Sequence, residues 1–295
     1  MNDAILVEGL TKTFRGFRKA AVKAVDEVSF SVAEGEAFGF IGPNGAGKSS
    51  TIKILTGVLR ASAGRALLFG VPVEQPQARR RLGYVPENPY LYDYLTPLEI
   101  LQMGMHLHKV TVADLPGHCL NWLERLELGK VAKTQIRSFS KGMTQRVAIA
   151  QALCIQPRLL ILDEPLSGLD PVGRRDVVDI LAEYKRGGGT LFFTSHVLHD
   201  VERLADRFGL IHKGRLRAVQ SPAELAGGKD MVQVRSMGAA LVAGMCSDFA
   251  ERWSVEVARD DLWQKLDELR AAGHIIIEVR PTLSLESAFM QAIGE

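Results

Sequence analysis

AFGFIGPNGAGKS, residues 37–49, is the stretch that decides the fold of this 295-residue chain. It opens with an apolar run typical of a buried strand, continues into the pattern GxxxxGK[ST], and is followed by a predicted helix over residues 47–58. Glycines let backbone N–H groups converge on an anion, and the start of a helix adds its positive dipole. The order strand, glycine turn, helix therefore predicts a phosphate-binding loop.

A second apolar strand supplies carboxylates to this loop. Residues 159–162 read LLIL and are followed by Asp163 and Glu164. Within the loop, Lys48 can reach the β- and γ-phosphates and the Ser49 hydroxyl can ligate Mg²⁺. We expect Asp163 to hold Mg²⁺ and Glu164 to orient and deprotonate the attacking water. An apolar strand ending in two acids is by itself a weak signal, but downstream of a phosphate loop it predicts hydrolysis of a triphosphate.

Short apolar segments alternate with helical patterns up to about residue 213. Strands are expected at 5–10, 27–32, 36–41, 64–70, 159–163 and 190–195. Helices are expected within 97–126 and at 141–155, 171–186 and 197–205. This alternation implies an α/β fold with a largely parallel sheet covered by helices, and with ligand loops at the carboxyl ends of the strands.

The character of the sequence changes after Lys213, where Ser-Pro at 221–222 and Gly-Gly at 227–228 punctuate the chain. A smaller alternating region follows. Its expected elements are 231–236, a helical stretch, 254–257, 260–272, 274–279 and 285–293. We therefore expect two domains, residues 1–220 and a small α+β accessory domain over residues 221–295.

Composition excludes several classes of protein. The 36 basic and 34 acidic residues give a formal charge of +2, which argues against a nucleic-acid partner, and the basic run 79–81 is interpreted as a solvated helix face. The three cysteines are far apart, so no disulfide framework is expected and a reducing compartment is favoured. No signal peptide and no apolar run of bilayer-spanning length are found, which predicts a soluble protein.

Residues 139–146, FSKGMTQR, resemble the signature LSGGQ followed by QR of the ABC ATPase family. Further family motifs follow in order: SGLD at 167–170 resembles the D-loop and TSH at 194–196 the switch-histidine segment. The resemblance covers about residues 6–220. In the family the signature faces the γ-phosphate bound by the opposite subunit, so it implies a homodimer that holds two ATP molecules, with Ser140 and Gly142 contributed across the interface and His196 sensing the γ-phosphate.

The resemblance also implies the remaining site residues. Phe14 stands where the family places an aromatic ring against adenine, although Phe17 competes for this role and a core position is the alternative. Glu87 stands where most members carry a glutamine that contacts Mg²⁺, the lytic water and the permease. The implied ATP-binding residues are Phe14, Gly42, Pro43, Asn44, Gly45, Ala46, Gly47, Lys48, Ser49, Ser50, Ser140 and Gly142. The implied catalytic residues are Glu164, His196 and Glu87, and the implied Mg²⁺ ligands are Ser49, Asp163 and Glu87.

The fold implied by the resemblance is a P-loop NTPase of ABC type, a mixed sheet core with a helical subdomain at about 88–156, plus the C-terminal α+β appendage. Lys141, Met143 and Glu87 depart from the common motifs in the manner of the subset that partners type-2 permeases, which export drugs, ions, lipids or polysaccharides. The segment PTLSLE at 281–286, with Phe289, resembles the tail of the same subset.

The expected function is therefore that of the ATP-hydrolysing subunit of an ABC exporter, cytoplasmic and held at the membrane by a separate integral permease. One rival is a soluble ABC ATPase acting on nucleic acid or the ribosome, but such proteins usually carry two cassettes or long coiled coils, and neither pattern is found. The other rival is a catalytically dead regulatory module. The presence of Asp163, Glu164 and His196 argues against it.

Overall fold

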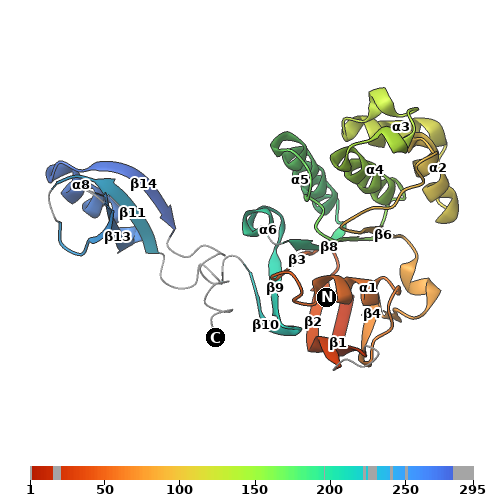
Figure 1. The fold of residues 1–295 in the computed structure, drawn as a ribbon, viewed down its shortest axis with the longest axis horizontal. Coiled ribbons are helices and arrows are strands. Elements are labelled where there is room, and N and C mark those ends of the chain that lie inside the picture. Colours follow the sequence, from red (N-terminus) through yellow and green to blue (C-terminus); the bar gives the residue numbers. More distant parts are fainter. Residues whose placement is uncertain are drawn as a thin grey trace. The chain divides into compact units, whose positions relative to one another are not determined.

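The computed structural model describes residues 2–15, 21–195, 197–221, 224, 231–239, 242–249 and 252–281. The chain divides into two compact units, residues 1–219 and 220–295, each with its own sheet structure (Figure 1). Among the described residues, no helix is long and apolar enough to cross a membrane. Cys119 and Cys154 are buried in the first unit, whereas Cys246 of the second unit is exposed.

The central sheet of the first unit has the strand order β10-β9-β3-β8-β7-β6. Its strands are β3 (Ala37–Ile41), β6 (Leu82–Val85), β7 (Leu159–Leu162), β8 (Thr190–Ser195), β9 (Arg207–His212) and β10 (Arg215–Gln220). Every residue of β3, β7 and β8 is buried, because helices or a second sheet cover both faces, and this explains the apolar sequences of β3 and β7 and the apolar centre of β8. The pairs β3–β8 and β7–β8 are parallel, so the carboxyl ends of these strands meet at one edge.

A second, antiparallel sheet packs against the central one. Its order is β2-β1-β4-β5, with β1 (Asp3–Phe14), β2 (Val22–Ala33), β4 (Ala63–Leu68) and β5 (Val71–Pro72). The ring of Phe30 in β2 stacks on Phe38 at 5.4 Å and on Phe192 at 5.8 Å between centroids, and Phe40 joins the same cluster. Stacked rings of this kind add to the burial of apolar area, so this cluster fixes the two sheets together.

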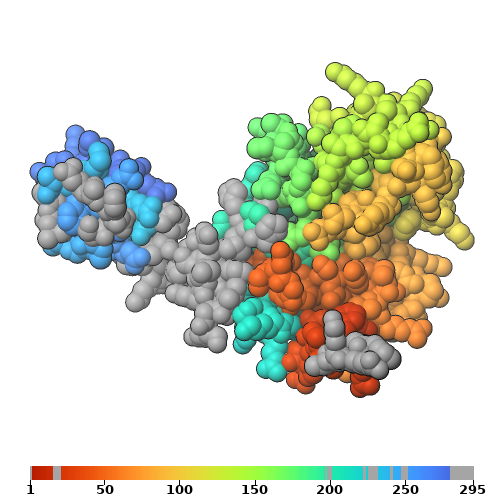
Figure 2. Space-filling view, viewed as in Figure 1, coloured from red at the N-terminus to blue at the C-terminus, as the bar shows by residue number. Residues whose placement is uncertain are grey.

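Helices complete the first unit. They are α1 (Lys48–Leu55), α2 (Pro97–Leu107), α3 (Leu115–Arg125), α4 (Lys141–Cys154), α5 (Pro171–Arg186) and α6 (Leu198–Leu204). Figure 1 shows α2, α3 and α4 gathered on the side of the central sheet away from β1 and β2, and Figure 2 shows this yellow to green layer lying directly on the orange part of the chain. A capping box of Thr96 and Glu99 begins α2, while Asp114 and Asp170 cap α3 and α5.

The second unit holds an antiparallel sheet of order β12-β13-β11-β14, formed by β11 (Met231–Met237), β12 (Cys246–Phe249), β13 (Arg252–Ala258) and β14 (Ile275–Pro281). Its core joins sheet residues such as Val234 and Val255 to Leu269 of α8 (Leu262–Ala271). The helical stretch expected after residue 236 is wrong for the described part, because Gly244 turns the chain at φ 83° and β12 follows. The element expected at 285–293 lies outside the described residues.

The α/β class is confirmed, and most expected elements are found within a few residues of their predicted ends. The helix expected to reach residue 58 ends at Leu55, because Gly57 adopts φ 72°, a left-handed conformation that stops a helix. Strands β6, β9 and β10 were not predicted. They lie at the two ends of the central sheet, and β6 is only four residues long.

Candidate functional site

The phosphate loop leaves the carboxyl end of β3 and enters α1 through glycines that the local packing requires. Gly47 has φ 111°, and a Cβ atom there would lie 2.4 Å from the carbonyl oxygen of Ala24. A Cβ atom at Gly42 would lie 2.2 Å from the carbonyl oxygen of Ile211. No side chain fits at these distances, so glycine at both positions lets the loop pass close to its neighbours.

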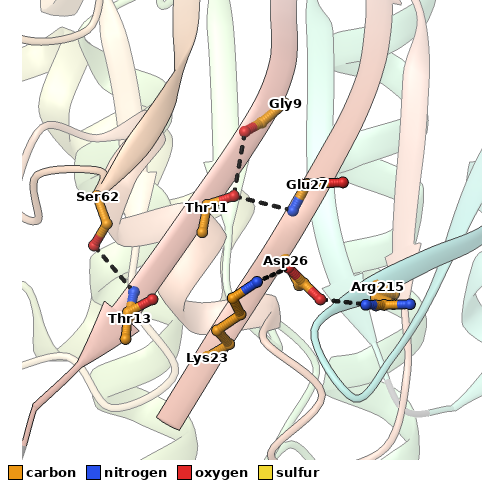
Figure 3. A network of polar contacts seen from close by, with 8 residues as sticks. All are labelled: Gly9, Thr11, Thr13, Lys23, Asp26, Glu27, Ser62 and Arg215. Atoms are coloured by element: carbon orange, nitrogen blue, oxygen red, sulfur yellow. Dashed lines mark hydrogen bonds and ion pairs between the residues drawn. The ribbon is translucent and has the colours of Figure 1, made fainter. Parts of the chain in front are cut away.

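The phosphate loop is hydrogen-bonded to the turn between β9 and β10, which is far from it in the sequence. The N–H of Gly214, between β9 and β10, donates to the carbonyl of Ala46 at 2.9 Å, and the N–H of Asp26 donates to the carbonyl of Gly214 at 2.8 Å. The Asp26 carboxylate in turn accepts from Lys23 at 2.8 Å and Arg215 at 2.7 Å (Figure 3). The hydrogen bond from Lys23, followed by that from Arg215, holds the pKa of Asp26 below its ordinary value.

The loop forms one wall of a pocket of about 540 Å³, which is large enough for a nucleotide. The pocket is lined by Ala24, Pro43, Asn44, Gly45, Ala46, Gly47, Lys48, Ser49, Ser50, Glu87 and Glu164. Lys48 is buried, donates from Nζ to the carbonyl of Gly42 at 2.7 Å, and lies 3.4 Å from Oε1 of Glu164. The pocket therefore contains the buried ammonium of Lys48 close to the carboxylate of Glu164, beside the glycine-rich loop.

The two acids that follow β7 are held by Thr194, a fully buried residue of β8. Its hydroxyl donates to Oδ1 of Asp163 at 2.7 Å and accepts from the backbone N–H of Glu164 at 2.9 Å. Glu164 adopts φ 51°, an uncommon conformation for a residue with a side chain. Burial, and next the charge of Asp163, raise the pKa of the neighbouring Tyr84 to about 12. The hydroxyl of Thr194 thus fixes both the aspartate and the turn that carries the glutamate.

The start of α4 lies apart from this pocket. Ser140 is exposed and caps the helix, accepting from the N–H of Met143 at 3.3 Å. Gly142 lies against the segment after Glu164, since a Cβ atom there would be 3.1 Å from the carbonyl oxygen of Gly168. One turn further, the buried Gln145 donates to the carbonyl of Pro165 at 3.1 Å. The signature segment is therefore fixed to the turn that carries the two acids.

The structure brings most predicted site residues together. Residues 43–50, Glu87 and Glu164 line the pocket, Asp163 is buried beside Glu164, and Ser140 and Gly142 are not among the described lining residues. Phe14 is also not among them; it is 44% exposed, with Nζ of Lys12 at 5.2 Å from its ring centre. His196 and Phe17 lie outside the described residues.

The roles of three residues at the site were not predicted from the sequence. Ala24 lines the pocket, Thr194 bridges the two acids, and Gln145 joins α4 to the turn after them. The motifs TSH and FSKGMTQR include Thr194 and Gln145, so a signal was present. Neither motif says which partner each side chain meets.

The fold and the site define the class: an α/β P-loop protein that binds a nucleoside triphosphate. The family model described as ABC transporter matches residues 25–167. An uncharacterised ABC transporter ATP-binding protein of Synechocystis is 43% identical over 215 residues, which cover 72% of this chain and 61% of that protein. The fluoroquinolones export ATP-binding protein of Mycobacterium tuberculosis is 40% identical over 235 residues, covering 79% and 76% respectively.

Solved structures agree with these relatives. An ATP-binding subunit of an ABC transporter is 31% identical, with a TM-score of 0.69, and the match covers 75% of this chain and 91% of that one. The chain therefore belongs to the family of ABC transporter ATP-binding proteins, and it is an ATPase of that family. The ATP-hydrolysing role expected from the sequence is confirmed.

Proposed function

We propose that this chain powers export through a type-2 ABC permease, as a homodimer in which each ATP lies between the phosphate loop of one copy and the α4 start of the other. The observation that carries the proposal is the placement of Ser140 and Gly142. They begin an exposed helix end, yet they do not line the pocket formed by the phosphate loop of their own chain. A helix start with free N–H groups favours an anion, so a second copy can complete the pocket.

The pocket residues have separate tasks in this proposal. Backbone N–H groups of the loop and the ammonium of Lys48 bind the phosphates and offset charge as it develops during transfer. Glu164, held in place through its own backbone N–H and Thr194, accepts the proton of the attacking water. Adenine stacking on Phe14 and γ-phosphate sensing by His196 belong to the same proposal and rest on the family resemblance.

The same pocket has the oxygen donors that Mg²⁺ prefers. Ser49 and Glu87 line it, and the carboxylate of Asp163 is oriented by a hydrogen bond at 2.7 Å. These three residues would hold the ion directly or through water, and the ion would neutralise charge on the phosphate oxygens. Glu87 keeps a metal-binding oxygen where the family resemblance implies a glutamine, and it adds a negative charge.

The connection from β6 to α2 supports a permease partner. Tyr90 is 97% exposed only three residues after Glu87, and Tyr92 and Tyr94 are also largely exposed, with their rings 5.8 Å apart. Tyrosine is enriched at protein interfaces because it combines a large apolar ring with a polar end. The drug-export name of the mycobacterial relative, together with Lys141, Met143 and Glu87, favours an exporter of type 2. Such a partner would hold the chain at the cytoplasmic face of the membrane, with no nucleic acid involved.

Substitution Glu164→Gln tests the proposal. It keeps the shape of the side chain but removes the base, so we expect ATP binding to persist while kcat for phosphate release falls by about 10²–10⁴-fold. With turnover blocked, Mg-ATP should hold the chain as a dimer in size-exclusion chromatography with light scattering. The variant Glu124→Gln, at an exposed position of α3, is the matched control and should behave as the unmodified protein.

Two results would contradict the proposal. Near-normal phosphate release by Glu164→Gln would remove Glu164 as the base. A monomer at every protein concentration in Mg-ATP, even with the permease supplied, would show that the sites are not shared between copies.

A further inference from the structure

A second concave site lies in the first unit, apart from the nucleotide pocket. Its volume is about 790 Å³, and its walls come from η1 (Pro76–Arg79) with the residues that follow it, from the end of α2, and from the segment before β7. The lining residues are Pro76, Arg79, Arg80, Arg81, Leu107, His108, Lys109 and Arg158. None of these described lining residues carries a carboxylate. We call this site the basic cleft.

Five permanent cations, four arginines and one lysine, therefore face one cavity in a chain whose formal charge is only +2. In the part of the chain that the structure describes, Arg80, Arg81 and Lys109 make no ion pair with a carboxylate. Cations elsewhere in the unit do, as in Lys185–Asp206 at 2.6 Å and Arg215–Asp26 at 2.7 Å. Like charges repel at short range, so such a cluster is stabilised by an anion placed among them.

Two of the arginines are fixed in position. Nη1 of Arg79 donates to the carbonyl of Val73 at 2.8 Å. The guanidinium also lies against Gly57, where an added Cβ atom would be only 2.3 Å from Nη1. Arg158 bonds Glu34 at 3.1 Å and lies 4.1 Å over the ring of Phe69. A guanidinium held in this way loses little conformational entropy when it binds an anion, and its fork of donors matches a phosphate group.

Arg81 and Lys109 adopt a backbone conformation that is uncommon for residues other than glycine. Their φ values are 54° and 53°, in the left-handed region where glycine is ordinarily favoured. Lys109 follows the end of α2, where a cation also offsets the helix dipole, and that explains one of the charges. The dipole of α2 does not explain Arg80 and Arg81, which follow η1.

We infer that the basic cleft is a binding site for a ligand with more than one phosphate group, either a soluble polyphosphate compound or the headgroup of an anionic phospholipid that carries two phosphates. The volume lies within the range of small-molecule sites. The described lining residues include no tyrosine, phenylalanine or tryptophan on which bases could stack, which favours a phosphate compound over single-stranded nucleic acid.

The test is binding of inorganic tripolyphosphate to the full chain by calorimetry, with saturating Mg-ADP present to occupy the phosphate loop. A parallel arm measures sedimentation with vesicles of phosphatidylcholine, with and without cardiolipin, whose headgroup carries two phosphates. Variant Arg80→Gln/Lys109→Gln removes two charges from the cleft, and Lys130→Gln/Lys133→Gln removes two exposed charges elsewhere. We expect the cleft variant to lose at least about tenfold in affinity and the control to change less than about twofold.

Each arm identifies a source. Loss of tripolyphosphate binding in the cleft variant alone supports a soluble ligand, and loss of sedimentation with cardiolipin vesicles alone supports a lipid headgroup. Far-UV circular dichroism checks that the variant is folded, and wild-type binding that weakens with added salt gives an independent check. The inference is overturned if wild type binds neither probe, if it binds only an RNA oligomer, or if both variants lose affinity equally.

Discussion

The bridge made by Thr194 gives a sharp test of how the site is built. Substitution Thr194→Val keeps the volume of the side chain but removes the hydroxyl that joins Asp163 to the backbone of Glu164. A hydrogen bond to a charged group contributes about 1.5–3 kcal/mol, and a bond between neutral groups about 1 kcal/mol. Because Thr194 is fully buried, we expect the free energy of unfolding to fall by about 3 kcal/mol.

Activity should fall as well. Without the bridge the turn at Glu164 is free to shift, and displacement of a catalytic group by about 1 Å can cost about 100-fold in rate. We expect kcat for ATP hydrolysis to fall by about 10- to 100-fold, while ATP affinity changes much less because the phosphate loop is untouched. Urea denaturation followed by circular dichroism, together with steady-state phosphate release, measures both effects.

Thr194→Ser is the matched control. It keeps the hydroxyl and loses one methyl group, which costs about 1 kcal/mol in a packed interior, so kcat should stay close to that of the unmodified protein. If Thr194→Val unfolds with the same free energy as wild type and hydrolyses ATP at the same rate, the bridge has no role in holding the acids. Equal losses in the valine and serine variants would assign the effect to packing rather than to the hydroxyl.

Three further outcomes follow from the geometry. Gly47→Ala should weaken Mg-ATP binding by at least about tenfold in fluorescence titration, because its Cβ atom would meet the carbonyl of Ala24 at 2.4 Å. The pKa of Asp26 is lowered, so its contribution to stability is fully present above the ordinary value of 3.8 and is lost as the pH falls through the lowered pKa. The melting temperature of Asp26→Asn should therefore depend less steeply on pH below about pH 4 than that of the unmodified protein. In native protein a thiol reagent should modify Cys246 quickly and the two buried cysteines only after denaturation.

The central strands and the phosphate loop could be predicted because their signals are local. Residues 159–162 are apolar throughout, 37–41 and 190–195 have apolar centres, and all of these residues are buried, which is typical of strands covered on both faces; the loop glycines follow residue 41 directly. The role of Thr194 could not be read in the same way. It depends on the parallel pairing of β7 with β8, which places residues about thirty positions apart at one edge.

Other differences have similar causes. Strand β6 is short and contains a glycine, and it forms only because β7 offers a parallel partner. Strand β12 follows an apolar run that resembles a helix, but pairing with β13 and the turn at Gly244 decide its conformation. Hydrophobic pattern and strand propensity depend only on residues that are close in the sequence. These two strands instead depend on pairing with partner strands, which forms only when the chain folds.

The turn at Gly214 has a consequence for how such chains can be rearranged. It supports the phosphate loop through Ala46 and is itself held by Asp26, and the boundary between the two units falls after residue 219, just beyond it. A C-terminal module could therefore be exchanged, added or deleted in the course of evolution or by protein engineering, provided that the junction comes after β10. A junction placed before Gly214 would remove the support of the loop while leaving every ABC motif of the sequence intact.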